Sequence, residues 1–163
     1  IYSIFDGFGS GIASPEYGII LQSRGRGFRL DPDHPNVISP NKRPFHPIIP
    51  AMITEGDKLA GVFGVMCGQY QAVGQMGFLI NYLDFGMSPQ QALDAPRSFA
   101  IDGALQLETR IDSAIADELS ARGHKIQIAD SPIGGGQAIC RNLDSGVLIA
   151  GSDPRKDGFA AGF

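Results

Sequence analysis

The distribution of proline constrains the fold of this chain more than any other feature of its sequence. Six of the eleven prolines lie between residues 31 and 50. Proline lacks a backbone N–H and fixes φ at about −65°, so this stretch can form neither a helix nor a central strand. Because it also carries Phe45, Ile48 and Ile49, we expect an ordered surface loop and not a flexible linker.

Length and composition exclude several classes of protein. The 163 residues, 43% hydrophobic and 18% charged, predict a single domain over residues 1–163, or one subunit of a larger assembly. The formal net charge of −4 gives no basic field, so we expect no nucleic-acid partner. No apolar run is long enough to cross a bilayer, so we also expect no membrane span.

The clearest helical pattern covers residues 69–85 and ends at Gly86. Its apolar positions recur at spacings of three and four, which is typical of a helix with one buried stripe. That stripe is Val73, Met76, Leu79, Ile80 and Leu83. We expect this face to pack against the core.

Two shorter helices are predicted from their end signals. Ser88 as N-cap, with Pro89 at the first helical position and Gln91 completing a capping box, starts one of them. The other covers residues 112–122, and Gly123 takes the C-terminal capping position.

Turn signals between β-like runs predict three hairpins. They lie at residues 55–57, 102–103 and 144–146, and a further strand is expected at 126–128. The predicted fold class is α+β, with antiparallel hairpins dominating and the helices grouped in the middle of the chain.

The segment from Gly61 to Gln71 is the most suggestive of chemistry. A strand there ends in a glycine-containing turn and a helix begins at once, so unpaired amides at the positive end of the helix dipole could bind an oxyanion. The alternative is a tight turn with glycines for steric reasons only, which spacing alone favours. Cys67 lies in this turn, but no histidine stands in a recognisable partner motif, so we interpret it as a buried, unreactive thiol.

Two further motifs favour ordinary turns. Gly134-Gly135-Gly136 resembles a phosphate-binding loop, but a strand follows it and no Gly-Lys-Ser/Thr is present, so we interpret it as a flexible turn. The segment from Asp31 to His34 has too few ligands for a calcium loop, and no Cys/His cluster has zinc spacing. We therefore expect no metal site.

In combination, eight segments resemble the small subunit of gamma-glutamyltransferases, most closely the branch often labelled cephalosporin-acylase-like. They are FGSGI (8–12), YGIILQSRGRGF (17–28), HPN (34–36), PNKRPFHPIIPAM (40–52), FGVMCGQ (63–69), LDFGMSPQQALDAPR (83–97), GGGQAI (134–139) and SDPRKDG (152–158). Each is weak alone, but their order and spacing together are highly specific.

This resemblance implies the C-terminal, small-subunit part of an N-terminal-nucleophile hydrolase with an αββα sandwich. Such enzymes are made as precursors that cut themselves before a threonine, whose hydroxyl is the nucleophile and whose α-amine is the base. By the family's pattern that threonine lies upstream of this chain. The implied partners are the large subunit of the same precursor and a small-molecule amide or γ-glutamyl-like substrate, with no metal or organic cofactor.

The resemblance also carries residue roles onto this chain. The family's oxyanion pair falls on Cys67 and Gly68, which would act through their backbone N–H groups. With the upstream threonine, they would form an acyl-enzyme and pass the acyl group to water or an amine.

The predicted substrate-binding residues depart from the family pattern. The acidic residue that binds the substrate ammonium falls near Gly27, with Arg24 and Arg26 where a polar or acidic side chain would be expected, and a pair of hydroxyl donors falls on His46 and Pro47. We expect an anionic or neutral acyl group instead of γ-glutamyl. The alternative is a catalytically silent family member that acts as a binding or structural subunit.

Overall fold

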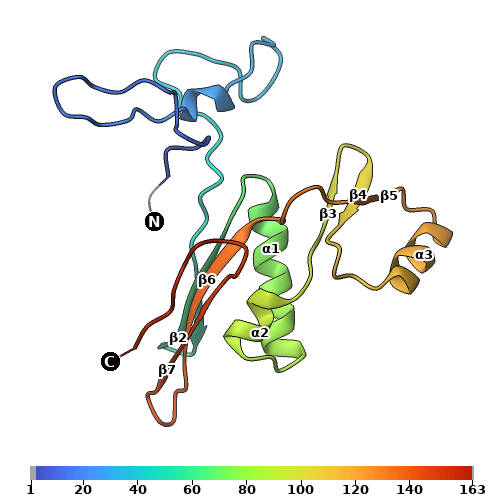
Figure 1. Cartoon of the computed structure of the whole chain (residues 1–163). Coiled ribbons are helices and arrows are strands. Elements are labelled where there is room, and N and C mark those ends of the chain that lie inside the picture. Colours follow the sequence, from blue (N-terminus) through green and yellow to red (C-terminus); the bar gives the residue numbers. More distant parts are fainter. Residues whose placement is uncertain (1–2, 163) are drawn as a thin grey trace. The chain divides into compact units, whose positions relative to one another are not determined.

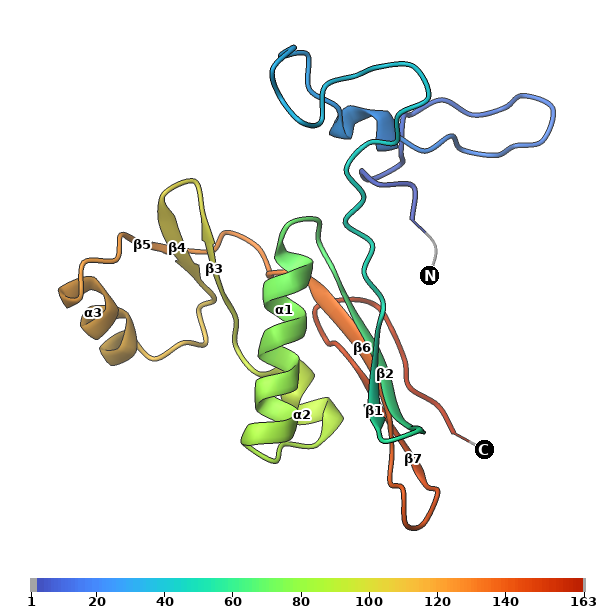
Figure 2. The ribbon, with the colours of Figure 1, turned by 180° about the vertical axis from the view of Figure 1, so that it is seen from behind.

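The computed structural model describes residues 3–162. It forms two compact units, one ending at Pro47 and the other beginning at Ile48. Figure 1 and Figure 2 show the chain from opposite sides. Within residues 3–162, no helix is long and apolar enough to cross a membrane.

The first unit has little regular secondary structure. Its helical segment is the 3-10 helix Arg24–Gly27. The proline-rich stretch 31–50 contains no helix or strand, as predicted. It is nevertheless ordered by Asn36, whose Oδ1 accepts a hydrogen bond from the Phe45 N–H at 3.1 Å and whose Nδ2 donates to the Gly27 carbonyl.

An antiparallel four-stranded sheet in the order β1-β2-β6-β7 forms the centre of the second unit. Its strands are β1 (Ala51–Glu55), β2 (Lys58–Met66), β6 (Gly135–Arg141) and β7 (Leu148–Ser152). The predicted hairpins at 55–57 and 144–146 are confirmed, since they connect β1 to β2 and β6 to β7.

Two helices pack on one face of this sheet (Figure 1, Figure 2). They are α1 (Tyr70–Leu79), which continues as a π-helical turn (Ile80–Asp84), and α2 (Pro89–Asp94). The capping box at Ser88 is confirmed, with both reciprocal hydrogen bonds to Gln91 present. The core between helices and sheet consists of Phe63, Phe78, Ala92, Leu93, Ala138 and Cys140.

The prediction of the buried face of α1 was wrong. The helix packs on the sheet through Tyr70, Gly74 and Phe78, which are buried. Four residues of the predicted stripe are 38–58% exposed: Val73, Met76, Ile80 and Leu83. The reason is steric, because a Cβ at Gly74 would lie 2.8 Å from Val65 Cγ1, so only this glycine face fits so close to β2.

A second sheet in the order β3-β4-β5 follows the helices. Its strands are β3 (Ser98–Ile101), β4 (Ala104–Leu107) and β5 (Ile126–Ile128), and the helix α3 (Ser113–Ala121) lies between β4 and β5 in the chain. The predicted hairpin at 102–103 is confirmed, with positive φ at both residues. Asp112 and Gly123 bound α3 as expected. The β4–β5 pair is parallel, unlike the pairs within the hairpins.

The interpretation of Gly134–Gly136 as a flexible turn was wrong. Gly135 and Gly136 begin β6 and are buried. A Cβ at Gly136 would lie 2.7 Å from Leu93 Cδ2, and one at Gly135 would overlap the Lys156 side chain. These glycines therefore serve close packing, which turn statistics do not reveal.

Candidate active site

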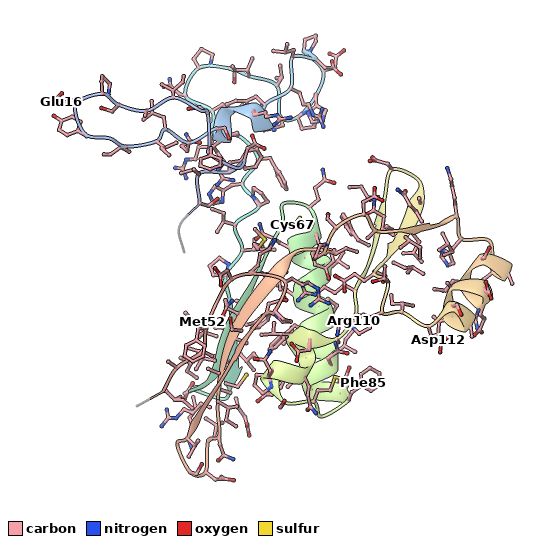
Figure 3. All side chains as sticks on the ribbon, viewed as in Figure 1. Glu16, Met52, Cys67, Phe85, Arg110 and Asp112 are labelled. Atoms are coloured by element: carbon pink, nitrogen blue, oxygen red, sulfur yellow. The ribbon has the colours of Figure 1, made fainter. Side chains whose placement is uncertain are left out.

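The turn from β2 to α1 carries the predicted oxyanion pair. Cys67 has φ +102° and Gly68 has φ +49°. The Tyr70 N–H donates to the Cys67 carbonyl at 2.9 Å, and the Gln71 N–H donates to the Gly68 carbonyl at 3.2 Å. Figure 3 shows Cys67 at the end of α1 where β2 stops. The carbonyls of the turn are thus engaged in the first turn of the helix.

The amide groups of the same turn are free. Within residues 3–162, the N–H groups of Cys67 and Gly68 donate no backbone hydrogen bond. They precede a ten-residue helix, whose positive dipole end adds to their attraction for negative charge. Two adjacent free donors at such a position can stabilise a developing oxyanion.

The prediction that Cys67 is a buried thiol was wrong. Its side chain is exposed, whereas the other cysteine, Cys140, is buried. The left-handed backbone at Cys67 directs its side chain away from the core. A residue with a Cβ is strained at such a φ, which glycine adopts at little cost.

Arg24 lies at the start of the 3-10 helix in the first unit. Its guanidinium carbon is 4.7 Å from the centroid of the Phe5 ring, and its Nη2 donates to Ser3 Oγ at 3.2 Å. Within residues 3–162, Arg24 forms no salt bridge. In contrast, Arg26 pairs with Asp6 at 3.2 Å. Of the two arginines, Arg24 is therefore the one whose charge is available to a ligand.

Gly27 packs against the loop that leads to His46. A Cβ at Gly27 would lie 3.5 Å from the Phe45 carbonyl oxygen and 3.6 Å from Pro44 Cβ, which are ordinary contacts. His46 is exposed and Pro47 is buried. The four predicted recognition residues therefore belong to the first unit, and the predicted oxyanion pair belongs to the second.

A buried charge cluster in the second unit was missed by the sequence analysis. It consists of Arg97, Glu108, Asp153 and Arg155. Arg97 Nη2 donates to Asp153 Oδ2 at 2.5 Å, and Arg155 Nη1 donates to Asp153 Oδ1 at 3.1 Å. Arg155 also binds both oxygens of Glu108, through Nε at 2.7 Å and Nη2 at 2.5 Å.

Backbone groups complete the charge cluster. Glu108 accepts the N–H groups of Arg97 and Ile133, each at 3.0 Å, and Asp153 Oδ2 accepts the Gly136 N–H at 2.8 Å. Burial acts to raise the pKa of Glu108, but these hydrogen bonds and Arg155 outweigh it and lower the pKa to about 2. The pKa of Asp153 is also lowered, since hydrogen bonds and both arginines outweigh its burial.

Part of this cluster could have been found in the sequence. Arg97, Asp153 and Arg155 stand in the Ala-Pro-Arg and Ser-Asp-Pro-Arg segments that carry the family resemblance. Glu108 has no such signal, because its partners are brought to it by the fold.

Comparisons with known proteins agree on the family. The gamma-glutamyltranspeptidase family model matches residues 1–163. The glutathione hydrolase-like YwrD proenzyme of Bacillus subtilis is 35% identical, over 99% of this chain and 32% of its own length. The oxamate amidohydrolase proenzyme of Klebsiella pneumoniae is also 35% identical, over 100% of this chain and 32% of its length. The chain thus spans about a third of these relatives.

Solved structures give the same result for the fold. Cephalosporin acylase from Bacillus halodurans is 45% identical with a TM-score of 0.93, covering 98% of this chain and 30% of that one. Gamma-glutamyltranspeptidase from Pseudomonas nitroreducens has a TM-score of 0.90 at 24% identity, covering 100% and 91%. The predicted α+β fold class, that of an N-terminal-nucleophile hydrolase, is confirmed. By sequence and by fold, this chain belongs to the gamma-glutamyltranspeptidase family.

Proposed function

We propose that this chain is the small-subunit part of an enzyme that cleaves or transfers an acyl group from an amide. The nucleophile is a threonine upstream of residue 1, which is exposed when the precursor cuts itself. The proenzyme names of the two reported relatives support such processing. The named activities of two similar proteins, the oxamate amidohydrolase and the cephalosporin acylase, support the reaction class. The observation that carries the proposal is the pair of free amides at Cys67 and Gly68.

The catalytic sequence follows from these groups. The threonine hydroxyl attacks the amide carbonyl and its proton passes to the α-amine of the same residue. The carbonyl oxygen gains negative charge, which the N–H groups of Cys67 and Gly68 stabilise. The α-ammonium group then returns the proton to the leaving amine, which departs and leaves the acyl-enzyme. Water or a second amine then attacks the same carbonyl and gives its proton to the α-amine, while the same two donors stabilise the oxyanion. The ester bond to the threonine oxygen breaks, and the proton returns to that oxygen.

The acyl group is anionic or neutral and not γ-glutamyl. An ammonium group needs a carboxylate partner when it leaves water, and Gly27 supplies none. Arg24 instead offers a cation held in place by Phe5 and Ser3. A dicarboxylate-derived acyl group, such as glutaryl, would complement this charge.

The large subunit of the same precursor is the proposed partner. The sheet β1-β2-β6-β7 has α1 and α2 on one face, and apolar residues are exposed on the other. Met52, 73% exposed, lies on the side away from α1 (Figure 3), next to Val62 and Ile139 in register. A groove of about 430 Å³ runs over this face between Leu59 and Leu148. An αββα sandwich places a second sheet here.

A matched pair of substrates tests the proposed function. Glutaryl-p-nitroanilide and γ-glutamyl-p-nitroanilide differ only in the α-amino group, and kcat/KM is measured for both with the complete processed protein. We expect higher kcat/KM for the glutaryl compound. A strong preference for the γ-glutamyl compound contradicts the proposed acyl group, and no turnover of either, with the upstream threonine absent, supports the silent family member.

Gly27 can be tested by adding the missing charge. Gly27→Asp fits sterically, because a Cβ there makes only ordinary contacts. We expect the variant to shift the kcat/KM ratio toward γ-glutamyl-p-nitroanilide. Gly25→Asp is the matched control, since it adds the same charge to the same 3-10 helix where no described atom lies within 4 Å of a Cβ. An equal shift in both variants would indicate a general field effect.

A further inference from the structure

We propose that Tyr70 is a positioning residue, whose buried ring fixes the direction of the Cys67 and Gly68 N–H groups. The inference rests on the proposed role of these two groups as oxyanion donors. We assign Tyr70 no contact with a reacting atom. It acts through the turn that it terminates.

The backbone of Tyr70 is bonded directly to the turn. Tyr70 is the first residue of α1, and its N–H donates to the Cys67 carbonyl at 2.9 Å. A rotation of the Cys67–Gly68 peptide would break this bond. This peptide carries the Gly68 N–H, so the position of Tyr70 sets the direction of that donor directly and limits the Cys67 residue that precedes it.

The ring of Tyr70 is held in a cavity that two glycines create. It is only 4% exposed. A Cβ at Gly134 would lie 2.7 Å from Tyr70 Cδ1, and a Cβ at Gly74 would lie 2.6 Å from Tyr70 Cε1. Both positions therefore exclude any larger residue while the ring is in place. The Phe99 ring packs edge-on against it at 5.3 Å and 78°.

Arg97 of the charge cluster also lies close to the Tyr70 ring. Arg97 Cζ lies 5.9 Å from the centroid of the Tyr70 ring. Arg97 Nη1 also donates to the Ile133 carbonyl at 2.8 Å, one residue before Gly134. The segment that leaves room for the ring is thus itself fixed by a buried cation.

The two ends of the turn are fixed by different means. Met66, before it, pairs with Gly135 in the β2–β6 ladder. Tyr70, after it, is held by its ring. Between them Cys67 and Gly68 have left-handed backbone, which repetitive helix or strand hydrogen bonds do not stabilise. Removal of the ring should therefore loosen this turn while the ladder remains.

Three variants of the complete processed protein test the inference. Tyr70→Leu removes the ring, Tyr70→Phe keeps it, and Phe78→Leu removes a ring of similar burial two turns further along α1. We expect Tyr70→Leu to lower kcat about 100-fold with KM little changed, since small misplacements of catalytic groups have effects of this size. Tyr70→Phe should retain most of the kcat of the unchanged protein. Phe78→Leu should lower stability to a comparable degree and leave kcat near that of the unchanged protein.

Amide hydrogen exchange gives a readout independent of activity. We expect faster exchange in a peptide covering residues 66–70 for Tyr70→Leu and no change there for Phe78→Leu. Equal effects of both variants on kcat and exchange would overturn the inference, because Tyr70 would then only contribute to packing. If the unchanged protein cleaves no amide, the proposed function fails, and the exchange comparison still decides whether Tyr70 positions the turn.

Discussion

Replacement of Glu108 by glutamine tests whether the charge cluster stabilises the fold. Glu108 accepts four hydrogen bonds, from Arg155 Nε and Nη2 and from the backbone N–H groups of Arg97 and Ile133. Each carboxylate oxygen accepts two of them. In Glu108→Gln one oxygen becomes an NH₂ donor, so two N–H groups lose their acceptor and face another donor.

The ion pair and the lowered pKa of Glu108 both set the size of the effect. Removal of one partner of a buried ion pair costs about 3–5 kcal/mol of unfolding free energy. A pKa lowered from 4.5 to about 2 corresponds to roughly 3 kcal/mol of stability at neutral pH. We therefore expect Glu108→Gln to reduce the unfolding free energy of the complete protein by about 3 kcal/mol.

Urea denaturation at pH 7 measures this loss, with Glu118→Gln as the matched control. Glu118 pairs with Arg122 on the surface of α3, where both side chains are more than 60% exposed. An exposed pair contributes about 0.5 kcal/mol or less, so the control should be nearly silent. A loss for Glu108→Gln no larger than that of Glu118→Gln would refute the reasoning.

The pH dependence gives a second signature of Glu108. Because its pKa is lower in the folded protein, its contribution is complete above pH 4.5 and is lost as the pH falls toward about 2. In this window the unchanged protein should lose up to about 1.4 kcal/mol per pH unit through Glu108. Glu108→Gln should lack that part of the slope and keep only the part that comes from Asp153, whose pKa is also lowered.

Three further changes have defined outcomes. Cys67→Gly should raise the thermal midpoint, because glycine relieves the strain at φ +102°, and it should keep kcat, because the N–H remains. A large loss of kcat in folded protein would instead indicate chemistry at the thiol. Gly136→Ala should cost about 1–3 kcal/mol in urea denaturation, since its Cβ meets Leu93 Cδ2 at 2.7 Å, and an unchanged midpoint would contradict this packing. The isolated 163-residue chain should self-associate, because apolar residues on its sheet are exposed, and it should cleave no amide. Light scattering that shows a monomer, together with measured amide turnover, would contradict this.

Local signals predicted much of the fold because they act over a few residues. Ser88, Pro89 and Gln91 meet within one turn of helix, and Asp102-Gly103 determines its hairpin by its own φ values. The face of α1 could not be predicted in this way. Val73 and Met76 have apolar spacing as good as that of Tyr70 and Phe78, and only the close approach of β2 at Gly74 decides between the two faces.

In the candidate site too, local sequence signals predicted some features, whereas others depend on contacts between distant residues. Spacing located the β2–α1 turn, but it could not show that the Cys67 side chain is exposed, since this depends on a left-handed backbone that cysteine rarely adopts. The resemblance located Arg24 and Arg26, whereas the Arg26–Asp6 pair, which neutralises one of them, depends on a contact across twenty residues of chain.

Arg97 is a buried cation at a position where an apolar side chain would need less desolvation free energy. Hydrophobic replacement of a buried ion pair is often neutral or stabilising, so packing alone does not require an arginine. A guanidinium, however, holds several acceptors in one plane. Arg97 fixes the Asp153 carboxylate and the Ile133 carbonyl in this way, and its charge faces the Tyr70 ring. It thereby joins the segment before β6, the residue after β7 and the first residue of α1. If Tyr70 positions the Cys67–Gly68 turn as we propose, Arg97 supports that turn through the ring as well as stabilising the core.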